Sequence, residues 1–163
     1  MVETKLSADF GSQIRAKLLE FESKAKIKLS KNQRILLAEV GTVEQTLSLI
    51  LNAPIIVSDI EQKVEGDWIT RSVWLGSDEN KVLHAKTEYY KPNIPEVVLR
   101  AIEHTGIGSA LTHYDIDTRR RIVEFGYDKE EQNHVWRRYE IWHETKILFD
   151  ITESFALSEE ALL

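Results

Sequence analysis

The chain has 163 residues, of which 42% are hydrophobic and 29% charged, so it is long enough for one domain with a substantial core and too short for two ordinary ones. It contains no cysteine, which excludes disulfides, thiol nucleophiles and thiolate metal sites. Its net charge of -6 argues against broad electrostatic binding to nucleic acid or anionic membranes, because such binding depends on a basic surface.

The sequence predicts a cytoplasmic protein that binds a small molecule. No apolar run approaches the roughly 18 residues of a membrane span, and the first residues do not resemble a secretory signal. Against an acidic background, an anionic ligand must be held by individual cations in a pocket. The positions of single arginines are therefore informative.

The N-terminal third predicts two helices with a short strand between them. Apolar residues at three- and four-residue intervals predict an amphipathic helix over about 8–26. Arg34–Val40 is an apolar run that we interpret as a strand. A capping-box pattern from Thr42 to Gln45 then begins a helix that ends at Asn52.

The rest of the chain predicts mostly strands. Period-two alternation from Ile55 to Lys91 predicts three antiparallel strands joined by tight turns. Asn93 is predicted to cap a helix that Gly106 ends, and a last helical turn is possible at 158–160. The remaining strands are expected at about 117–127, 134–143 and 146–155.

These elements predict an α+β fold, an antiparallel sheet of about six strands with helices packed against it. We expect a single domain over residues 1–163. Within it, the N-terminal helix occupies about 8–26, and the sheet with its helices occupies about 30–157.

Two charged residues interrupt apolar strand faces. Side chains alternate along a strand, so Arg71 shares a face with Ile69, Val73 and Leu75. In the same way, Glu153 falls on one face with the apolar residues Ile147, Phe149, Ile151 and Phe155. A buried charge is costly unless it is paired, so each of the two needs a partner.

Two interpretations of these charges are open. Arg71 and Glu153 pair with each other or with polar neighbours inside the sheet, or they line a cavity. In the second case the guanidinium suits a carboxylate, and the glutamate can accept a hydroxyl hydrogen bond or exchange a proton. The pair then describes a site for a molecule with a carboxylate at one end and a hydroxyl at the other.

Two glycine turns could complete such a site. Gly41–Val43 and Gly106–Gly108 both leave backbone N–H groups free, and such groups bind anions. The alternative for Gly106 is an ordinary helix C-cap.

An ordered series of short motifs resembles the chorismate pyruvate-lyases, including the bacterial and archaeal relatives that make 4-hydroxybenzoate. The likeness runs from about Leu29 to Leu157. Its motifs are Ile69-Thr-Arg-Ser-Val-Trp-Leu75, Ala85-Lys-Thr87, Gly106-Ile-Gly108, Thr118-Arg119, Trp136-Arg-Arg-Tyr139 and Ile151-Thr-Glu-Ser-Phe155.

The resemblance implies specific roles for five residues. Arg71 looks like the arginine that holds the ring carboxylate, and Glu153 looks like the glutamate that meets the ring hydroxyl. The N–H groups of Val43 and Ile107 would assist at the carboxylate. Lys86 stands where the family often has a second arginine, and a lysine offers a point charge in place of a planar fork.

The implied reaction expels pyruvate from chorismate and leaves 4-hydroxybenzoate, without metal, nucleotide or flavin cofactor. Two alternatives remain. One is a non-catalytic domain of the same fold that senses a small acid, and the other is a related enzyme for a different carboxylated ring. The departure at Lys86 keeps the latter open.

Other polar residues give weaker signals. The five histidines lack metal-ligand spacing, so no metal site is expected. Arg119, Arg137 and Arg138 fall in a region of poor alternation, where a solvated strand face and a functional role are equally compatible with the sequence.

Overall fold

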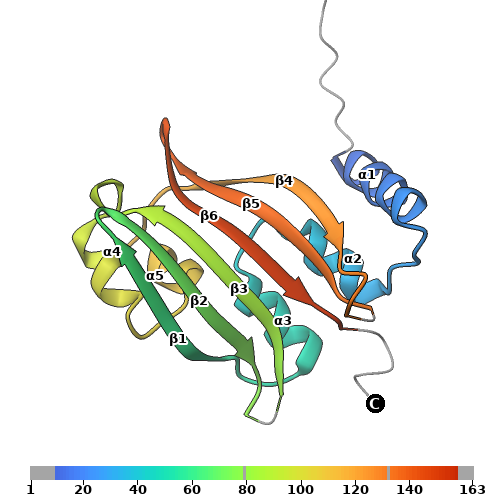
Figure 1. The fold of residues 1–163 in the computed structure, drawn as a ribbon, viewed down its shortest axis with the longest axis horizontal. Helices are drawn as coiled ribbons and strands as arrows, with labels where there is room; N and C mark the ends of the chain where they lie inside the picture. The colour runs from blue at the N-terminus through green and yellow to red at the C-terminus, as the bar shows by residue number, and fades with distance from the viewer. Residues whose placement is uncertain (1–9, 79, 132, 158–163) are drawn as a thin grey trace, which may run out of the picture.

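The computed structural model describes residues 10–78, 80–131 and 133–157. Figure 1 shows one large sheet with helices behind it and α1 beside its β4 edge. The elements in chain order are α1 (Phe10–Ala25), α2 (Lys31–Ala38), α3 (Val43–Leu51), β1 (Ile56–Glu65), β2 (Trp68–Gly76), β3 (Lys81–Tyr90), the 3₁₀ turn η1 (Lys91–Asn93), α4 (Glu96–Ala101), α5 (Ile107–His113), β4 (Arg119–Tyr127), β5 (Val135–His143) and β6 (Lys146–Phe155).

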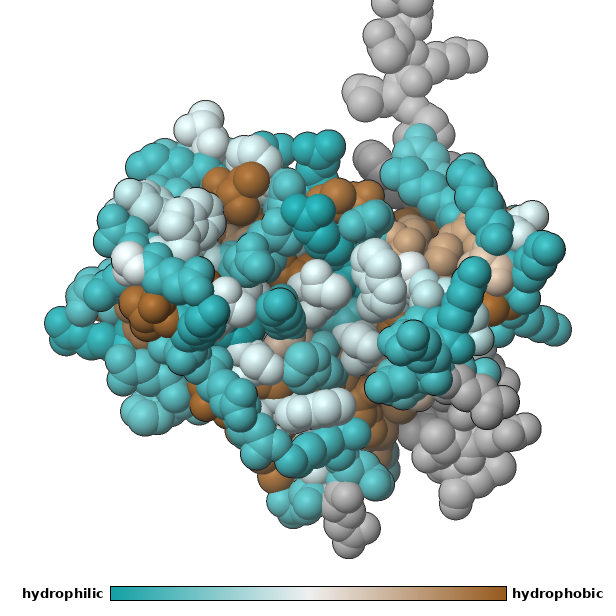
Figure 2. Space-filling model, in the orientation of Figure 1, coloured by the Kyte–Doolittle hydropathy of each residue, from teal (hydrophilic) through white to brown (hydrophobic). Residues whose placement is uncertain are grey.

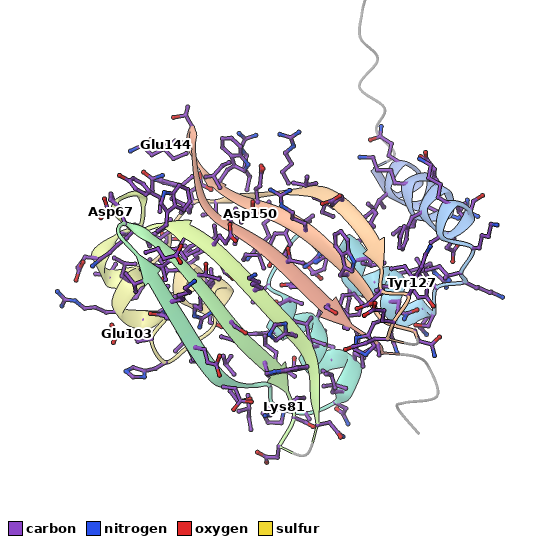
Figure 3. All side chains as sticks on the ribbon, viewed as in Figure 1. Asp67, Lys81, Glu103, Tyr127, Glu144 and Asp150 are labelled. Atoms are coloured by element: carbon purple, nitrogen blue, oxygen red, sulfur yellow. The ribbon has the colours of Figure 1, made fainter. Side chains whose placement is uncertain are left out.

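The six strands form one antiparallel sheet in the order β1-β2-β3-β6-β5-β4. Each half of the sheet is a three-strand meander, β1 to β3 and β4 to β6, and the halves meet where β3 pairs with β6. In Figure 3, Asp67 and Lys81 mark the two opposite ends of β2 and β3. The predicted α+β class and the six antiparallel strands are confirmed.

The helices cover one face of the sheet and leave the other open. The covered face carries the core, in which Leu83, Phe149 and Ile141 are fully buried. Figure 2 shows the open face, where most residues are hydrophilic or only weakly apolar. The period-two alternation that the sequence showed therefore reflects one buried and one solvated face.

The strand predicted over Arg34–Val40 is wrong, because Lys31–Ala38 is the helix α2. Ser30 caps it: the Ser30 hydroxyl accepts from the Gln33 N–H at 3.1 Å, and the Gln33 side chain accepts from the Ser30 N–H at 2.9 Å. The capping box lies just before the apolar run, and this signal decides the local structure. Leu36 and Leu37 are fully buried on the sheet side of α2.

The connection between the two halves also differs from the prediction. Asn93 belongs to the 3₁₀ turn, and α4 begins after Pro95. Gly106 does not end a helix as a C-cap but caps the start of the seven-residue helix α5, so the turn at Gly106–Gly108 is the entry to a helix. Thr42 is the N-cap of α3, as expected, but makes no side-chain capping hydrogen bond.

The predicted N-terminal helix is confirmed as α1, and the possible turn at 158–160 lies outside the described residues. Among the described helices, none combines the length and apolarity that a membrane crossing requires.

Candidate active site

A narrow cavity lies between the covered face of the sheet and the first turns of α3 and α5. Its empty volume is about 440 Å³, including its open mouth. The floor is apolar, with Val73, Ala85 and Ile151 among its residues. In sites for small organic molecules, a few polar groups in an apolar wall usually fix the orientation of the ligand.

Arg71 and Glu153 both line this cavity, on different strands. Arg71 of β2 pairs with Thr87 of β3, and Thr87 pairs in turn with Ile151 of β6. Glu153 lies two residues further along β6. Because neighbouring strands are about 4.8 Å apart, β2 and β6 are separated by roughly 10 Å. The two charged groups do not pair with each other, and the space between them is open to a ligand.

Arg71 is anchored to the connection between α4 and α5. It is 2% exposed, and its Nη2 donates to the carbonyls of Ile102 at 3.0 Å and Thr105 at 2.8 Å. Its buried Nε has no hydrogen-bond partner among the described residues. Arg71 therefore has at least one N–H that no described group occupies.

Glu153 is held by two donors. Its Oε2 accepts from Arg137 Nε at 2.8 Å and its Oε1 from the Tyr139 hydroxyl at 2.7 Å. Burial raises the pKa of Tyr139 well above its ordinary value, and the charge of Glu153 adds to the rise, so the phenol remains a donor. The carboxylate is fixed in orientation, and each oxygen retains a lone pair for a further donor.

Arg137 is the fully buried counter-ion of Glu153. It is 0% exposed, and its Nη1 donates to the carbonyls of Leu37 at 3.5 Å and of Glu39. These bonds tie β5 to the end of α2. The sequence left two interpretations of Glu153 open, and both hold: it pairs with polar neighbours, and it lines a cavity.

Arg120 is a cavity residue that the sequence analysis missed. Its Nη1 donates to the Val40 carbonyl at 3.2 Å, and its buried Nε has no partner among the described residues. Its charge opposes the rise in the pKa of Tyr139, after the larger effects of burial, Glu153 and Arg137. The Val40 carbonyl follows the Glu39 carbonyl that binds Arg137, so Arg120 lies towards the Arg137 and Glu153 end of the cavity. The run of three arginines at 119–121 hid it, because alternation there is irregular.

Val43 and Ile107 line the cavity where α3 and α5 begin. The first N–H groups of a helix have no partner within the helix, so we expect the N–H groups of these two residues to be available as donors at the wall. A side chain at Gly108 would press on Thr42 at 3.2 Å and Arg120 at 3.4 Å. Glycine at this position permits the close approach of the two helix starts.

Lys86 does not lie in the cavity. Its neighbours Ala85 and Thr87 point inward and are buried, so strand alternation places Lys86 on the open face, where it is exposed. Its cross-strand partners Ser72 and Thr152 are on that face as well. The prediction that Lys86 belongs to the ligand site is therefore wrong, because its side chain lies on the opposite face of the sheet.

The two remaining arginines lie outside the cavity. Arg138 Nη2 pairs with Asp150 at 2.7 Å on the open face, and the Arg119 guanidinium lies 5.2 Å from the centre of the Trp142 ring. Within residues 10–78, 80–131 and 133–157, no group of three or more acidic or histidine side chains could hold a metal ion.

A family model described as chorismate pyruvate-lyase Rv2949c-like matches residues 31–163. The chain belongs to this family. The suspected family is thereby confirmed, and it supports a lyase at the level of the family. A search among curated proteins gave no match. The match covers α2 to β6, and hence every element that lines the cavity of this lyase-family protein.

The buried pair of Arg137 and Glu153 makes the fold sensitive to a single neutralisation. Arg137→Met would leave Glu153 charged and buried with Tyr139 as its remaining donor, which we expect to cost about 3–5 kcal/mol of unfolding free energy. Arg138→Met, the adjacent control, breaks a partly exposed pair and should cost about 0–1 kcal/mol. Denaturant unfolding monitored by circular dichroism measures both, and equal costs would contradict the burial argument.

Proposed function

We propose that the protein is a chorismate lyase that eliminates pyruvate from chorismate and forms 4-hydroxybenzoate. The single observation that carries the proposal is the placement of Arg71 and Glu153 in one narrow, mostly apolar cavity without a hydrogen bond between them. The family match supports the same reaction class.

The ring of the substrate would lie along the apolar floor between these two groups. Its carboxylate would take the free N–H of Arg71, with help from the backbone of Val43 and Ile107. Its hydroxyl, para to the carboxylate, would donate to Glu153, which Arg137 and Tyr139 hold in position.

The second carboxylate, on the enolpyruvyl group, would be bound by Arg120 in place of Lys86. In chorismate this group is attached to the carbon next to the one that bears the hydroxyl, so its carboxylate belongs near the Glu153 end. Arg120 lines the cavity and acts electrostatically on Tyr139 at that end. Its guanidinium also offers the planar fork that a lysine lacks.

The reaction then requires only that the substrate is held in one orientation and that the negative charge of the leaving group is stabilised. The bond between the ring carbon and the enolpyruvyl oxygen breaks, and the neighbouring ring carbon that bears the hydroxyl loses its hydrogen as a proton. The leaving enolate takes up a proton at its methylene carbon to become pyruvate. Aromatisation supplies much of the driving force. The arginines stabilise the negative charge that develops on the leaving enolate, and the cavity holds the ring in one orientation.

Incubation of the purified protein with chorismate, without added metal or nucleotide, tests the proposal. We expect equal amounts of 4-hydroxybenzoate and pyruvate, measured by chromatography and by a coupled pyruvate assay. Tight chorismate binding without products would instead identify a small-acid sensor. Turnover of another carboxylated ring, with chorismate inert, would identify a related enzyme.

Substitutions at the two ends of the cavity should change different kinetic constants. Arg71→Ala removes a contact made in both ground and transition states, so we expect mainly a rise in KM, by roughly 10²-fold. Glu153→Gln keeps the shape but loses a charged acceptor, and we expect mainly a fall in kcat, by roughly 10²-fold. Full activity in both variants would refute the site, provided circular dichroism shows them folded.

Arg120 and its neighbour Arg121 form a matched pair, because Arg121 is exposed and absent from the cavity wall. Arg120→Ala should raise KM for chorismate by roughly 10–100-fold, since it removes the partner of the second carboxylate. The same variant should bind 4-hydroxybenzoate with a Kd within about threefold of the native value, because this product lacks the second carboxylate. Arg121→Ala should change neither value. Equal losses for substrate and product would exclude this role for Arg120.

A further inference from the structure

Glu44, in the first turn of α3, is an acidic residue inside the cavity that the proposed reaction does not use. Its Oε2 accepts a hydrogen bond from the Ser109 hydroxyl of α5 at 2.9 Å. Its Oε1 lies where a side chain at Gly106 would begin, because a Cβ there would be 1.7 Å from that oxygen. Gly106 and Ser109 thus form a seat for this carboxylate.

The seated carboxylate acts on Arg71. Burial lowers the pKa of Arg71, and the charges of Tyr89 and Glu44 oppose this effect. The hydrogen bonds of Arg71 Nη2 nevertheless go to the carbonyls of Ile102 and Thr105, and its Nε stays unpartnered among the described residues. The Glu44 carboxylate rests against Gly106, the residue after Thr105, whose carbonyl binds Arg71, so the two charges lie in the same part of the cavity without a hydrogen bond between them.

We propose that Glu44 competes electrostatically with the ligand carboxylate for the charge of Arg71, which weakens binding and speeds release of the product. The identity of the ligand rests on the proposed function. The seat made by Ser109 and Gly106 holds the competing charge inside the cavity when no ligand is bound.

The physical reason is repulsion in a confined space. Two carboxylates beside one guanidinium in a largely apolar cavity repel each other more strongly than they would in water. A ligand carboxylate on Arg71 therefore meets the charge of Glu44, which Ser109 holds in the same cavity. The free energy of that repulsion is lost from the affinity of substrate and product alike.

The consequence concerns product release. A benzoate held by a buried arginine, two backbone N–H groups and a fixed glutamate would leave slowly, because affinity differences appear mostly in the dissociation rate. A carboxylate that Ser109 holds in the same cavity lowers that barrier, because its repulsion raises the free energy of the bound state.

The test measures the Kd of 4-hydroxybenzoate and of the neutral 4-hydroxybenzamide by calorimetry, and the dissociation rate of 4-hydroxybenzoate by stopped flow. Glu44→Gln should tighten 4-hydroxybenzoate binding roughly tenfold, mainly through slower dissociation, and should change amide binding by less than about twofold. Glu61→Gln, an exposed change on β1 with the same loss of charge, is the control and should have no effect.

Ser109→Ala tests the seat itself. Ser109 holds the Glu44 carboxylate, so its removal should tighten 4-hydroxybenzoate binding by roughly threefold in the native background. In the Glu44→Gln background the same change should have no effect on the benzoate, because the charge it positions is gone. A merely structural role of Ser109 would weaken both ligands in both backgrounds.

The outcomes separate this proposal from the proposed function. Unchanged or weaker 4-hydroxybenzoate binding in Glu44→Gln would overturn the competitor role, even if the native protein converts chorismate. Tighter binding of the benzoate alone would sustain the role, even if chorismate is inert. Equal tightening of the acid and the amide would overturn it, as would the absence of any 4-hydroxybenzoate binding to either protein.

Discussion

The ion pair between Arg137 and Glu153 is the interaction on which the rest of the site depends. Both side chains are buried near the middle of the sheet, at 0% and 2% exposure, and the pair joins β5 to β6. Its second function is to hold the end of α2 through the carbonyls of Leu37 and Glu39. A fixed carboxylate is available to a ligand because an arginine already offsets the cost of burying it.

Arg71 follows the same principle by different means. Its partners are the carbonyls of Ile102 and Thr105, so the residue that would hold the ligand also fixes the connection between α4 and α5. That connection leads into Gly106, where Glu44 rests, and into Ile107 in the cavity wall. The cavity is thus assembled from buried charges whose structural contacts leave one side of each group free.

Strand alternation predicted the sheet and its two buried charges, because a charge in an apolar row of a half-buried strand is unambiguous. It could not predict Arg120, which lies in a row of three arginines beside an irregularity between Ile122 and Glu124. Lys86 was misplaced because family position was given more weight than alternation, which put it on the open face. The helix α2 was missed because an apolar triplet looked like a strand, and its capping box was overlooked.

The position of β6 has a consequence for how the chain reaches its native state. This strand follows the other five along the sequence, yet it lies in the interior of the sheet, between β3 and β5. Until β3 pairs with β6, each meander exposes an unpaired edge, and Arg71 and Glu153 lie in separate halves of the sheet. That pairing joins residues far apart in sequence, and contacts of this kind slow folding in general; the cavity takes residues from both halves, so it cannot be complete before the pairing forms.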